Sequence, residues 1–515
     1  MAAFREVKRL FDPQGILNPG KKIPLEGVQA TAPLRRVTYP LLERLSADGE
    51  TLAAGNGAGP AVPKDGPLIS LELAWSPEEM TYAARMCNGC GVCRTQSVDT
   101  RMCPTFRPSP REEASPRSKA NLARALLTGS LPAGVVVDEE FKEILDLCVH
   151  CHMCRLECPA NVDIPKLMSE AKAAYVTTNG QNFFDWAATR IDYLCSLAGK
   201  APRVANWAVG NRAARWVMEK TLGIAQGRKL PRFNKRPFLA SSTQRRLSEP
   251  PREPGASGER VVLFVDTYAN HCDDQLAKAL VAVLEHNGVA VHVPALQLDS
   301  GMPMIAQGVL GPARKIAEKN VGLLVEAARR GDTIISTEPS AVLALTREYR
   351  HLLGSDEDAA LVAEHSQEAC QYLWRLHQQG KLKLEFSPLE MLVGYHAPCH
   401  VKALESGLPA VHLMGLIPGL QVRHVDKGCS GMAGMYGFQR KNYRTSLRIG
   451  LPLITEMRTS GFHTAVSECS TCRVQIEQGS ALPTLHPVKL LALAYGLMPE
   501  LGDLLDRPAE SLIVG

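Results

Sequence analysis

Four cysteines between residues 148 and 158 constrain this chain more than any other feature of its sequence. They follow the pattern Cys148-x2-Cys151-x2-Cys154-x3-Cys158-Pro159. Thiolates are the soft ligands that iron–sulfur clusters require, and two-residue gaps let one loop supply three corners of a cubane. In such a run the fourth cysteine ligates a second cluster. The pattern therefore predicts a [4Fe–4S] cluster and requires a partner run elsewhere in the chain.

The partner run lies upstream and reads Cys87-x2-Cys90-x2-Cys93-x9-Cys103-Pro104, with an enlarged last gap. Exchanging the fourth ligands predicts two sites: Cys87, Cys90, Cys93 and Cys158 for cluster one, and Cys148, Cys151, Cys154 and Cys103 for cluster two. The alternative is a pair of zinc sites. Zinc sites usually pair CxxC units, so a third cysteine in register before Cys-Pro, twice, favours clusters. His150 and His152 alternate with these ligands, and we expect them to be hydrogen-bond donors or exposed residues.

Of the 15 cysteines, four more gather near the C-terminus, at Cys399, Cys429, Cys469 and Cys472. Each lies near the end of a predicted strand or in the loop that follows it. Ligand sites of open α/β sheets lie at the carboxyl ends of strands, so these thiols are predicted to converge on a metal or cluster. The alternative is four buried small residues. His396 and His400 flank Cys399 and are expected to be hydrogen-bond partners, and Cys195, Cys272 and Cys370 to be buried.

Two segments rich in glycine, alanine and proline, residues 46–67 and 240–259, are predicted to be linkers. A chain of 515 residues exceeds what one hydrophobic core usually serves. The segments delimit an N-terminal stub, a cysteine-dense helical domain at 68–239 and a C-terminal domain at 260–515. The stub begins with an amphipathic helix, MAAFREVKRLF, and the chain has no apolar run of membrane-spanning length. We therefore expect a cytoplasmic protein.

The C-terminal domain alternates strand and helix signals. Val261–Val265 and Val289–Val293 are β-branched runs, and Leu276–Glu285 between them has helical periodicity. This alternation predicts α/β architecture with a largely parallel sheet.

The same domain contains a diverged internal repeat. DSGM at 299–302 matches CSGM at 429–432, and ISTEPSA at 335–341 matches VSECSTC at 466–472. The nearly constant offset predicts half-repeats at about 260–351 and 392–496. The first-half equivalents of the four C-terminal cysteines are Ala269, Asp299, Glu338 and Ala341. They offer no thiolates, so the first half is predicted to be a structural pseudo-repeat.

Charge is unevenly distributed, although the net charge is only +5. The segment from Arg190 to Arg252 has 14 Lys and Arg residues against three acidic ones. A solvated surface is the simplest interpretation. No groove-reading motif accompanies the segment, so nucleic acid is not expected. An acidic partner or peripheral contact with an anionic membrane face is the alternative.

The cluster runs, the segment SPRSKANLARALLTG at 115–129 and the paired half-repeats resemble the iron–sulfur half of bacterial FAD-linked 2-hydroxy-acid dehydrogenases. Glycolate oxidase iron–sulfur subunits, anaerobic glycerol-3-phosphate dehydrogenase C subunits and heterodisulfide reductase share these modules. FDPQGILNPGKKIP at 11–24 is similar to the closing segment of FAD-linked oxidases, so residues 1–24 resemble the end of their cap domain. The resemblance implies a mixed fold: an α-helical dicluster ferredoxin-like domain followed by an α/β cysteine-rich domain of two half-repeats.

The resemblance implies that electrons pass from a reduced flavin, held by a separate domain or subunit, through two [4Fe–4S] clusters to a quinone or other carrier. The expected substrate is D-2-hydroxyglutarate or D-lactate. The chain would be the C-terminal half of a fused enzyme, or a split subunit, inactive on hydroxy acids without its FAD partner.

The family's half-repeat reads C…CCG…CxxC, whereas this chain has Cys429-Ser430-Gly431 and Asp299-Ser300-Gly301. The missing second cysteine disfavours a non-cubane cluster at the C-terminal site, so a four-thiolate cluster or a zinc ion is the ligand expected there. The alternative functions to electron transfer are a heterodisulfide-reductase-like thiol redox enzyme and a scaffold with structural zinc.

Overall fold

The computed structural model describes residues 2–14 and 71–506, which fall into two compact units. The first unit comprises residues 1–68 and 124–133, and its described part includes helix α1 (Ala2–Phe11). This helix confirms the predicted amphipathic helix. The predicted linker at 46–67, and residues 15–24 of the predicted cap remnant, lie outside the described residues. The second unit, residues 69–123 and 134–515, carries every cysteine of the chain.

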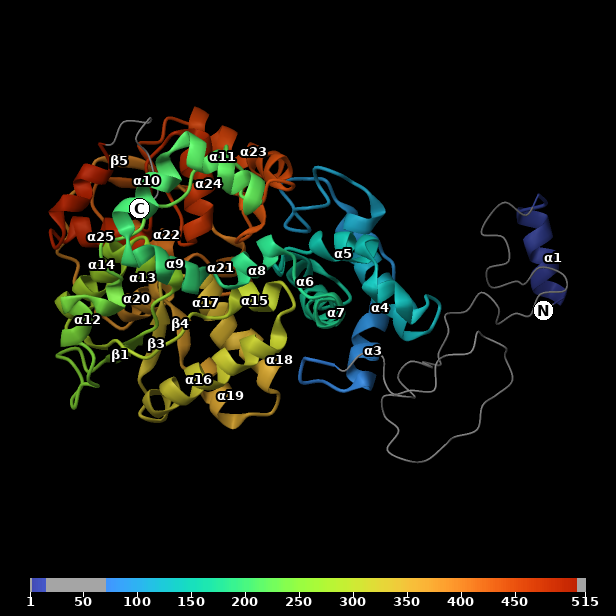
Figure 1. Cartoon of the computed structure of the whole chain (residues 1–515), viewed down its shortest axis with the longest axis horizontal. Coiled ribbons are helices and arrows are strands. Elements are labelled where there is room, and N and C mark those ends of the chain that lie inside the picture. The colour runs from blue at the N-terminus through green and yellow to red at the C-terminus, as the bar shows by residue number, and fades with distance from the viewer. Residues whose placement is uncertain (1, 15–70, 507–515) are drawn as a thin grey trace. The chain divides into compact units, whose positions relative to one another are not determined.

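The cysteine-dense region of the second unit is helical, as predicted (Figure 1). Helix α3 begins with a capping box in which Ser76 and Glu79 satisfy each other's backbone N–H groups, and α7 begins at its N-cap Asp163. The helices are α3 (Pro77–Arg85), α4 (Pro116–Leu127), α5 (Glu139–Asp146), α6 (Met153–Glu157), α7 (Ile164–Asn179), α8 (Phe183–Thr189), α9 (Ile191–Lys200), α10 (Pro202–Gly210) and α11 (Arg212–Thr221).

Two small parallel sheets form the C-terminal region within the described residues. The first contains β1 (Arg260–Leu263), β2 (Ala290–His292), β3 (Thr333–Ser336) and β4 (Ser366–Glu368), in the order β2-β1-β3-β4. The second contains β5 (Met391–Tyr395), β6 (Leu420–His424), β7 (Thr464–Val466) and β8 (Thr484–Leu485), in the order β6-β5-β7-β8. The two orders are identical along the chain. This identity, with all pairings parallel, confirms the predicted α/β half-repeats, although the first extends beyond its predicted end near residue 351 because β4 is its last strand.

Helices cover both sheets, because parallel strands need crossover connections. The first half-repeat has α13 (Thr267–His271), α14 (Asp274–His286), α15 (Met302–Ala306), α16 (Leu310–Arg329), α17 (Pro339–Leu343), α18 (Tyr349–Leu353), α19 (Glu357–Glu364) and α20 (Ala369–Gln378). The second has α21 (Cys399–Ala403), α22 (Pro409–Met414), α23 (Tyr443–Thr459), α24 (Ser470–Ser480) and α25 (Pro487–Ala494). One apolar core contains Leu263 of the first sheet and Val393 of the second, so the half-repeats fold against each other.

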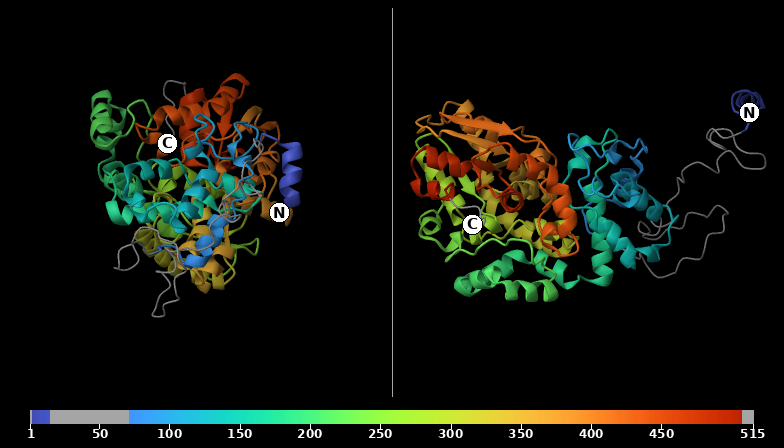
Figure 2. Two further views of the ribbon diagram at one scale, coloured as in Figure 1. Left: turned by 90° about the vertical axis from the view of Figure 1, so that its right-hand side faces the viewer. Right: turned by 90° about the horizontal axis from the view of Figure 1, so that it is seen from above.

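The segment between the helical region and the first sheet is partly packed. Residues 240–259, predicted as a linker, include helix α12 (Ser242–Arg246), and Leu247 is buried in the core that both half-repeats share. Helices α9 to α11 run along one side of the C-terminal region (Figure 2). None of the helices in the described residues is long and apolar enough to cross a bilayer.

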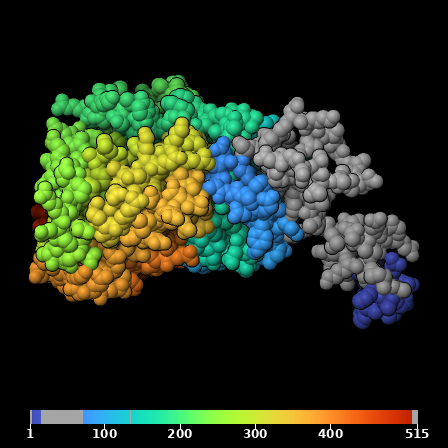
Figure 3. All heavy atoms as spheres, turned by 90° about the horizontal axis from the view of Figure 1, so that it is seen from below, coloured from blue at the N-terminus to red at the C-terminus, as the bar shows by residue number. Residues whose placement is uncertain are grey.

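The start of the second unit packs on the first half-repeat. The backbone N–H of Ala74 donates a hydrogen bond of 2.8 Å to the carbonyl of His351, and Arg314 donates one to the carbonyl of Glu72. Figure 3 shows this segment, in blue, against the yellow surface of the first half-repeat. The helical region is therefore held directly on the α/β region.

Candidate iron–sulfur and thiolate sites

The cysteines predicted for cluster one lie together, and we call them the first set. Cys87, Cys90, Cys93 and Cys158 all border one small cavity. Cys90 is exposed and Cys87 is buried, so this set lies near the protein surface. Burial raises the pKa of Cys93, and repulsion from the Cys87 and Cys90 thiolates adds to it. The structure thus brings Cys158 to the upstream run, far from it in sequence.

The second set consists of Cys103, Cys148, Cys151 and Cys154. Burial raises the pKa of Cys154, and the thiolates of the three other members raise it further because they lie close by. The Cys103 sulfur lies 3.1 Å from the Thr105 hydroxyl. That hydroxyl donates a 2.8 Å hydrogen bond to the carbonyl of Leu147, next to Cys148. Cys103 is therefore held at the downstream run rather than at its own.

The two cysteine runs have the same backbone turns. Gly89 and Gly91 have φ angles of 76° and 79°, and His150 and His152, at the equivalent positions, have φ angles of 54° and 60°. Glycine adopts this left-handed region freely, whereas a histidine there is uncommon and strained. The two runs therefore have left-handed residues at the same positions relative to their cysteines. Both histidines are buried, 3% and 1% exposed, so of the two roles expected for them, hydrogen-bond donor or exposed residue, the second is wrong.

The third set, Cys399, Cys429, Cys469 and Cys472, converges on one cavity of about 570 Å³. Cys399 begins α21, and Cys469 is the N-cap of α24. Cys429 accepts a 3.2 Å hydrogen bond from the N–H of Gly431, and Cys472 accepts one of 3.1 Å from the Ser430 hydroxyl. Ser430, which replaces the family's second cysteine, is thus a hydrogen-bond donor to a neighbouring sulfur.

The thiols of the third set have opposed acidities. Hydrogen bonding from Cys472 lowers the pKa of Cys469 to about 6, while the same bond raises the pKa of Cys472. The bond therefore favours the thiolate form at Cys469 over that at Cys472, and the thiolate is the form that binds metal.

The glycine of the Cys-Ser-Gly segment has a structural role. Gly431 has a φ angle of 90°, and a Cβ there would come within 2.1 Å of the Ser446 carbonyl oxygen. The loop that carries Cys429 therefore packs so closely on α23 that only glycine fits.

The second and third sets border the same space. Cys148 and Cys151 line the 570 Å³ cavity together with all four cysteines of the third set. Burial raises the pKa of Cys399, and repulsion from Cys429 and Cys151 raises it further. Cys154 also borders the small cavity of the first set. The three sets therefore follow one another through the protein.

Carboxylates of the first half-repeat face the same cavity, and sequence reasoning missed their proximity. Asp266, Asp299 and Glu338 all line it. Burial raises the pKa of Glu338 to about 8 and that of Asp266 to about 7. Glu338 accepts hydrogen bonds of 3.0 and 2.7 Å from the N–H and hydroxyl of Ser470. The repeat offset pairs Glu338 with Cys469. This pairing was the sequence signal that could have placed Glu338 at the cavity.

The remaining cysteines and one histidine behave as expected. Cys195, Cys272 and Cys370 are buried, which confirms that prediction. His400 is a hydrogen-bond partner, as predicted: Nδ1 lies 2.9 Å from the Ser340 hydroxyl and Nε2 lies 3.0 Å from the carbonyl of His150. His396 is buried, burial lowers its pKa to about 3, and its Nδ1 has no hydrogen-bond partner among the described residues, so the predicted hydrogen-bond role is not seen at that nitrogen.

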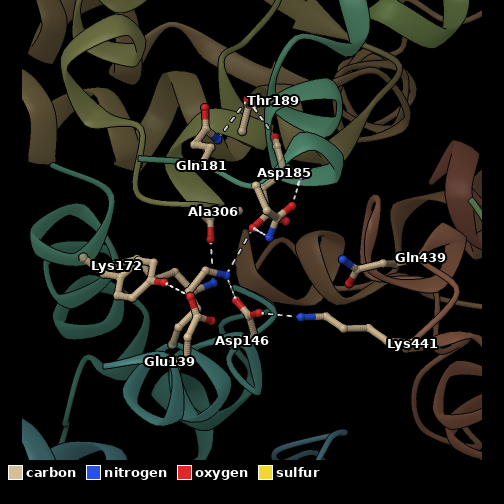
Figure 4. Close-up of polar contacts among 12 residues, drawn as sticks. Glu139, Asp146, Lys172, Gln181, Asp185, Thr189, Ala306, Gln439 and Lys441 are labelled. Carbon is tan, nitrogen blue, oxygen red and sulfur yellow. Dashed lines mark hydrogen bonds and ion pairs between the residues drawn. The ribbon is translucent and has the colours of Figure 1, made fainter. Parts of the chain in front are cut away.

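A buried lysine links the second set to the α/β region. Lys172 of α7 donates hydrogen bonds to the carbonyls of Cys148 and Ala306, at 2.8 and 2.7 Å. Figure 4 shows Lys172 facing Ala306, while Lys441 of the second half-repeat reaches Asp146 of α5 at 3.0 Å. Burial lowers the pKa of Lys172. This lysine ties the loop that carries Cys148 to the first half-repeat.

We expect Lys172→Met to destabilise the second unit by about 2–4 kcal/mol, because two buried carbonyls lose a charged donor. Anaerobic urea unfolding, followed by tryptophan fluorescence and by cluster absorbance, measures this. Lys441→Met is the matched control, since its half-exposed ion pair contributes about 1 kcal/mol or less. Equal midpoints for the two variants would contradict the role of Lys172.

Comparisons with known proteins agree with this architecture. The family model of the 4Fe-4S dicluster domain matches residues 83–162, and that of the cysteine-rich domain matches residues 393–477. The model of the C-terminal domain of FAD linked oxidases matches residues 1–22. The chain is thus an iron–sulfur protein with kinship to FAD-linked oxidases, as the motifs predicted.

One relative decides the family. The C subunit of the anaerobic glycerol-3-phosphate dehydrogenase of Escherichia coli K12 is 30% identical over 409 residues, which cover 79% of this chain and 98% of that protein. The chain belongs to the family of anaerobic glycerol-3-phosphate dehydrogenase C subunits. The D-2-hydroxyglutarate dehydrogenase of the same organism is 25% identical over 95% of this chain, which spans about half of that protein's length. The B subunit of the CoM/CoB fumarate reductase of Methanothermobacter marburgensis is 24% identical over 45% of each chain. These relatives confirm the predicted kinship with iron–sulfur components of flavin-linked dehydrogenases.

Proposed function

We propose that this member of the C-subunit family carries electrons from the flavin of a 2-hydroxy-acid dehydrogenase to a membrane quinone. The observation that carries the proposal is the succession of the three cysteine sets. Cys154 borders the cavity of the first set, and Cys148 and Cys151 border that of the third. An electron relay needs such neighbouring redox sites between a donor and an acceptor.

The first and second sets fit [4Fe–4S] clusters, because each brings four cysteine sulfurs together. When bound, these clusters accept and release one electron at a time. The chain's own residues exclude water by burial, donate hydrogen bonds toward sulfur and fix the spacing of the sites. The third set would hold a further cluster or a zinc ion. The exposure of Cys90 supports electron entry at the first set from a flavin partner.

The proposed acceptor is a quinone because apolar side chains of α9 and α10 line the cavity that also borders the third set. Ile191 and Leu194 of α9 and Val209 of α10 line it from inside. The outer faces of the same helices expose Tyr193 and Trp207, with basic residues among them. Amphipathic helices with tryptophan and tyrosine at the rim and cationic neighbours bind anionic membrane surfaces. We therefore propose peripheral contact with the inner face of the bacterial membrane.

For the substrate we favour D-2-hydroxyglutarate or D-lactate. The match of residues 1–22 to the FAD linked oxidases supports a flavin partner of that type, and the similarity to D-2-hydroxyglutarate dehydrogenase extends over 95% of the chain. Glycerol 3-phosphate is the second candidate, because the C-subunit relative from Escherichia coli is 30% identical over nearly its whole length. The chemistry on the substrate would belong to the FAD partner in either case.

The test is to purify the full chain anaerobically from its native membrane fraction together with any flavoprotein bound to it. D-2-hydroxyglutarate, D-lactate and glycerol 3-phosphate are then added separately while the iron–sulfur signals are followed by low-temperature EPR. We expect a bound FAD protein and cluster reduction by one of the two hydroxy acids, reversed by a water-soluble quinone. The matched control is the same mixture with the Cys90→Ser variant, in which reduction should fail.

Reduction by glycerol 3-phosphate alone would favour the second candidate. Protein that lacks a flavin partner but cleaves a disulfide substrate would favour the thiol redox enzyme, and zinc without iron would favour the scaffold. Either of the last two results would overturn the electron-transfer proposal.

A further inference from the structure

Two histidines and a glutamate form a buried cluster beside the second set. His150 and His152 come from the loop that carries Cys148 and Cys151, and Glu348 ends the π-helical segment Ala344–Glu348 of the first half-repeat. All three are buried, at 3% exposure or less. One ligand atom of each, an imidazole nitrogen or a carboxylate oxygen, lies within 4.8 Å of the other two. The cluster therefore joins the helical region to the α/β region.

Several polar atoms of this cluster have no hydrogen-bond partner among the described residues. They are Nε2 of His150, both ring nitrogens of His152 and Oε1 of Glu348, and all four are buried. A buried polar atom without a hydrogen bond destabilises the folded state, because it has lost its contact with water. Four such atoms in one place indicate a ligand that bonds to all of them.

The distances fit a metal ion better than an ion pair. His152 Nε2 lies 3.3 Å from Glu348 Oε1, and His150 Nε2 lies 3.5 Å from Glu348 Oε2. Both are long for a charge-assisted hydrogen bond, which is about 2.7–2.9 Å. Ligand atoms bound tetrahedrally at about 2.0–2.1 Å from zinc are about 3.3–3.4 Å apart. The spacing is therefore that of two ligands on one ion.

The neighbours of the cluster orient it as they do in metal sites. Nδ1 of His150 lies 3.4 Å from the Ser169 hydroxyl, which leaves Nε2 for a metal. Nδ1 of His351, which has no hydrogen-bond partner within residues 71–506, lies 3.5 Å from Glu348 Oε2, on the carboxylate oxygen that also faces His150. Two histidines and a carboxylate are a common ligand set for zinc.

We propose that His150, His152 and Glu348 bind one zinc ion, separate from the cysteine sites. The ion would cross-link the cysteine loop to the first half-repeat. It would also hold the strained left-handed turns at His150 and His152, whose cost needs a compensating interaction. Because its ligands are nitrogen and oxygen, this site is chemically distinct from the thiolate sites.

The test is metal analysis of the cluster-loaded chain after expression with added zinc, combined with sulfide analysis. We expect about one zinc per chain at this site, lost in Glu348→Gln and retained in Glu368→Gln, a control that alters another buried glutamate of the same half-repeat. The Cys472→Ala variant distinguishes this zinc from any zinc bound by the third cysteine set. It should retain the zinc that depends on Glu348.

A second variant and a spectroscopic probe guard against misfolding. His152→Asn keeps a residue that tolerates positive φ and should also lose the zinc while the visible cluster spectrum persists. Expression with cobalt should yield d–d bands that Glu348→Gln abolishes without loss of any sulfur-to-cobalt charge transfer. Wild-type protein without zinc, or equal zinc in wild type and in folded Glu348→Gln and His152→Asn, would overturn the proposal.

Discussion

Replacing Cys103 with serine is expected to remove the cluster bound by Cys148, Cys151 and Cys154, although Cys103 belongs to the other cysteine run. The structure holds Cys103 beside the downstream run through Thr105 and Leu147, and its thiolate is close enough to raise the pKa of Cys154. A serine hydroxyl is a poor ligand for iron. We expect the iron content of anaerobically purified protein to fall by about four atoms per chain, with matching loss of sulfide.

The identity of the lost cluster is read from EPR spectra of the reduced protein. The Cys90→Ser variant, altered in the first set, supplies the reference spectrum for loss of the other cluster. Cys195→Ser is the matched control, because Cys195 is a buried thiol outside all three sets and its loss should leave both signals intact. If Cys103→Ser and Cys90→Ser lose the same signal, the exchange of fourth ligands is wrong.

The second large effect is expected for Cys472→Ala, which should empty the third set and leave both [4Fe–4S] clusters in place. Cys472 is hydrogen-bonded to Cys469 and Ser430, so its removal takes away a ligand and disturbs a second one. Alanine is a suitable replacement, because the equivalent Ala341 is buried in the first half-repeat without disrupting it. We expect the third set's metal, iron or zinc, to disappear, and the C-terminal region to unfold at a lower temperature.

The measurement combines metal analysis with a thermal unfolding scan under anaerobic conditions. Cys370→Ala is the matched control, because Cys370 is equally buried but lies in the apolar core. The metal content of this variant should equal that of the wild type. Unchanged iron and zinc in Cys472→Ala would mean that the four cysteines are only buried residues and that the chain carries two clusters.

Local spacing made much of the candidate site predictable. Three cysteines at two-residue gaps lie close together in the sequence, and the loop turns between them occur at equivalent positions in both runs, at Gly89, Gly91, His150 and His152. The two half-repeats were predictable for a similar reason. Matching segments at a constant offset imply matching strands, and the observed strand orders agree.

The cysteine spacing thus predicted which thiols lie together as candidate ligands, and the motifs and repeats predicted the mixed fold and the duplicated α/β unit. The contacts between these parts became visible in the folded chain alone. The tertiary structure placed the second and third sets on one cavity, brought Glu338 to Ser470 and set Glu348 against His150 and His152. These partners are far apart in sequence, and neither periodicity nor spacing records such contacts. Packing of separate cores determines them, because burial of apolar surface fixes which faces meet.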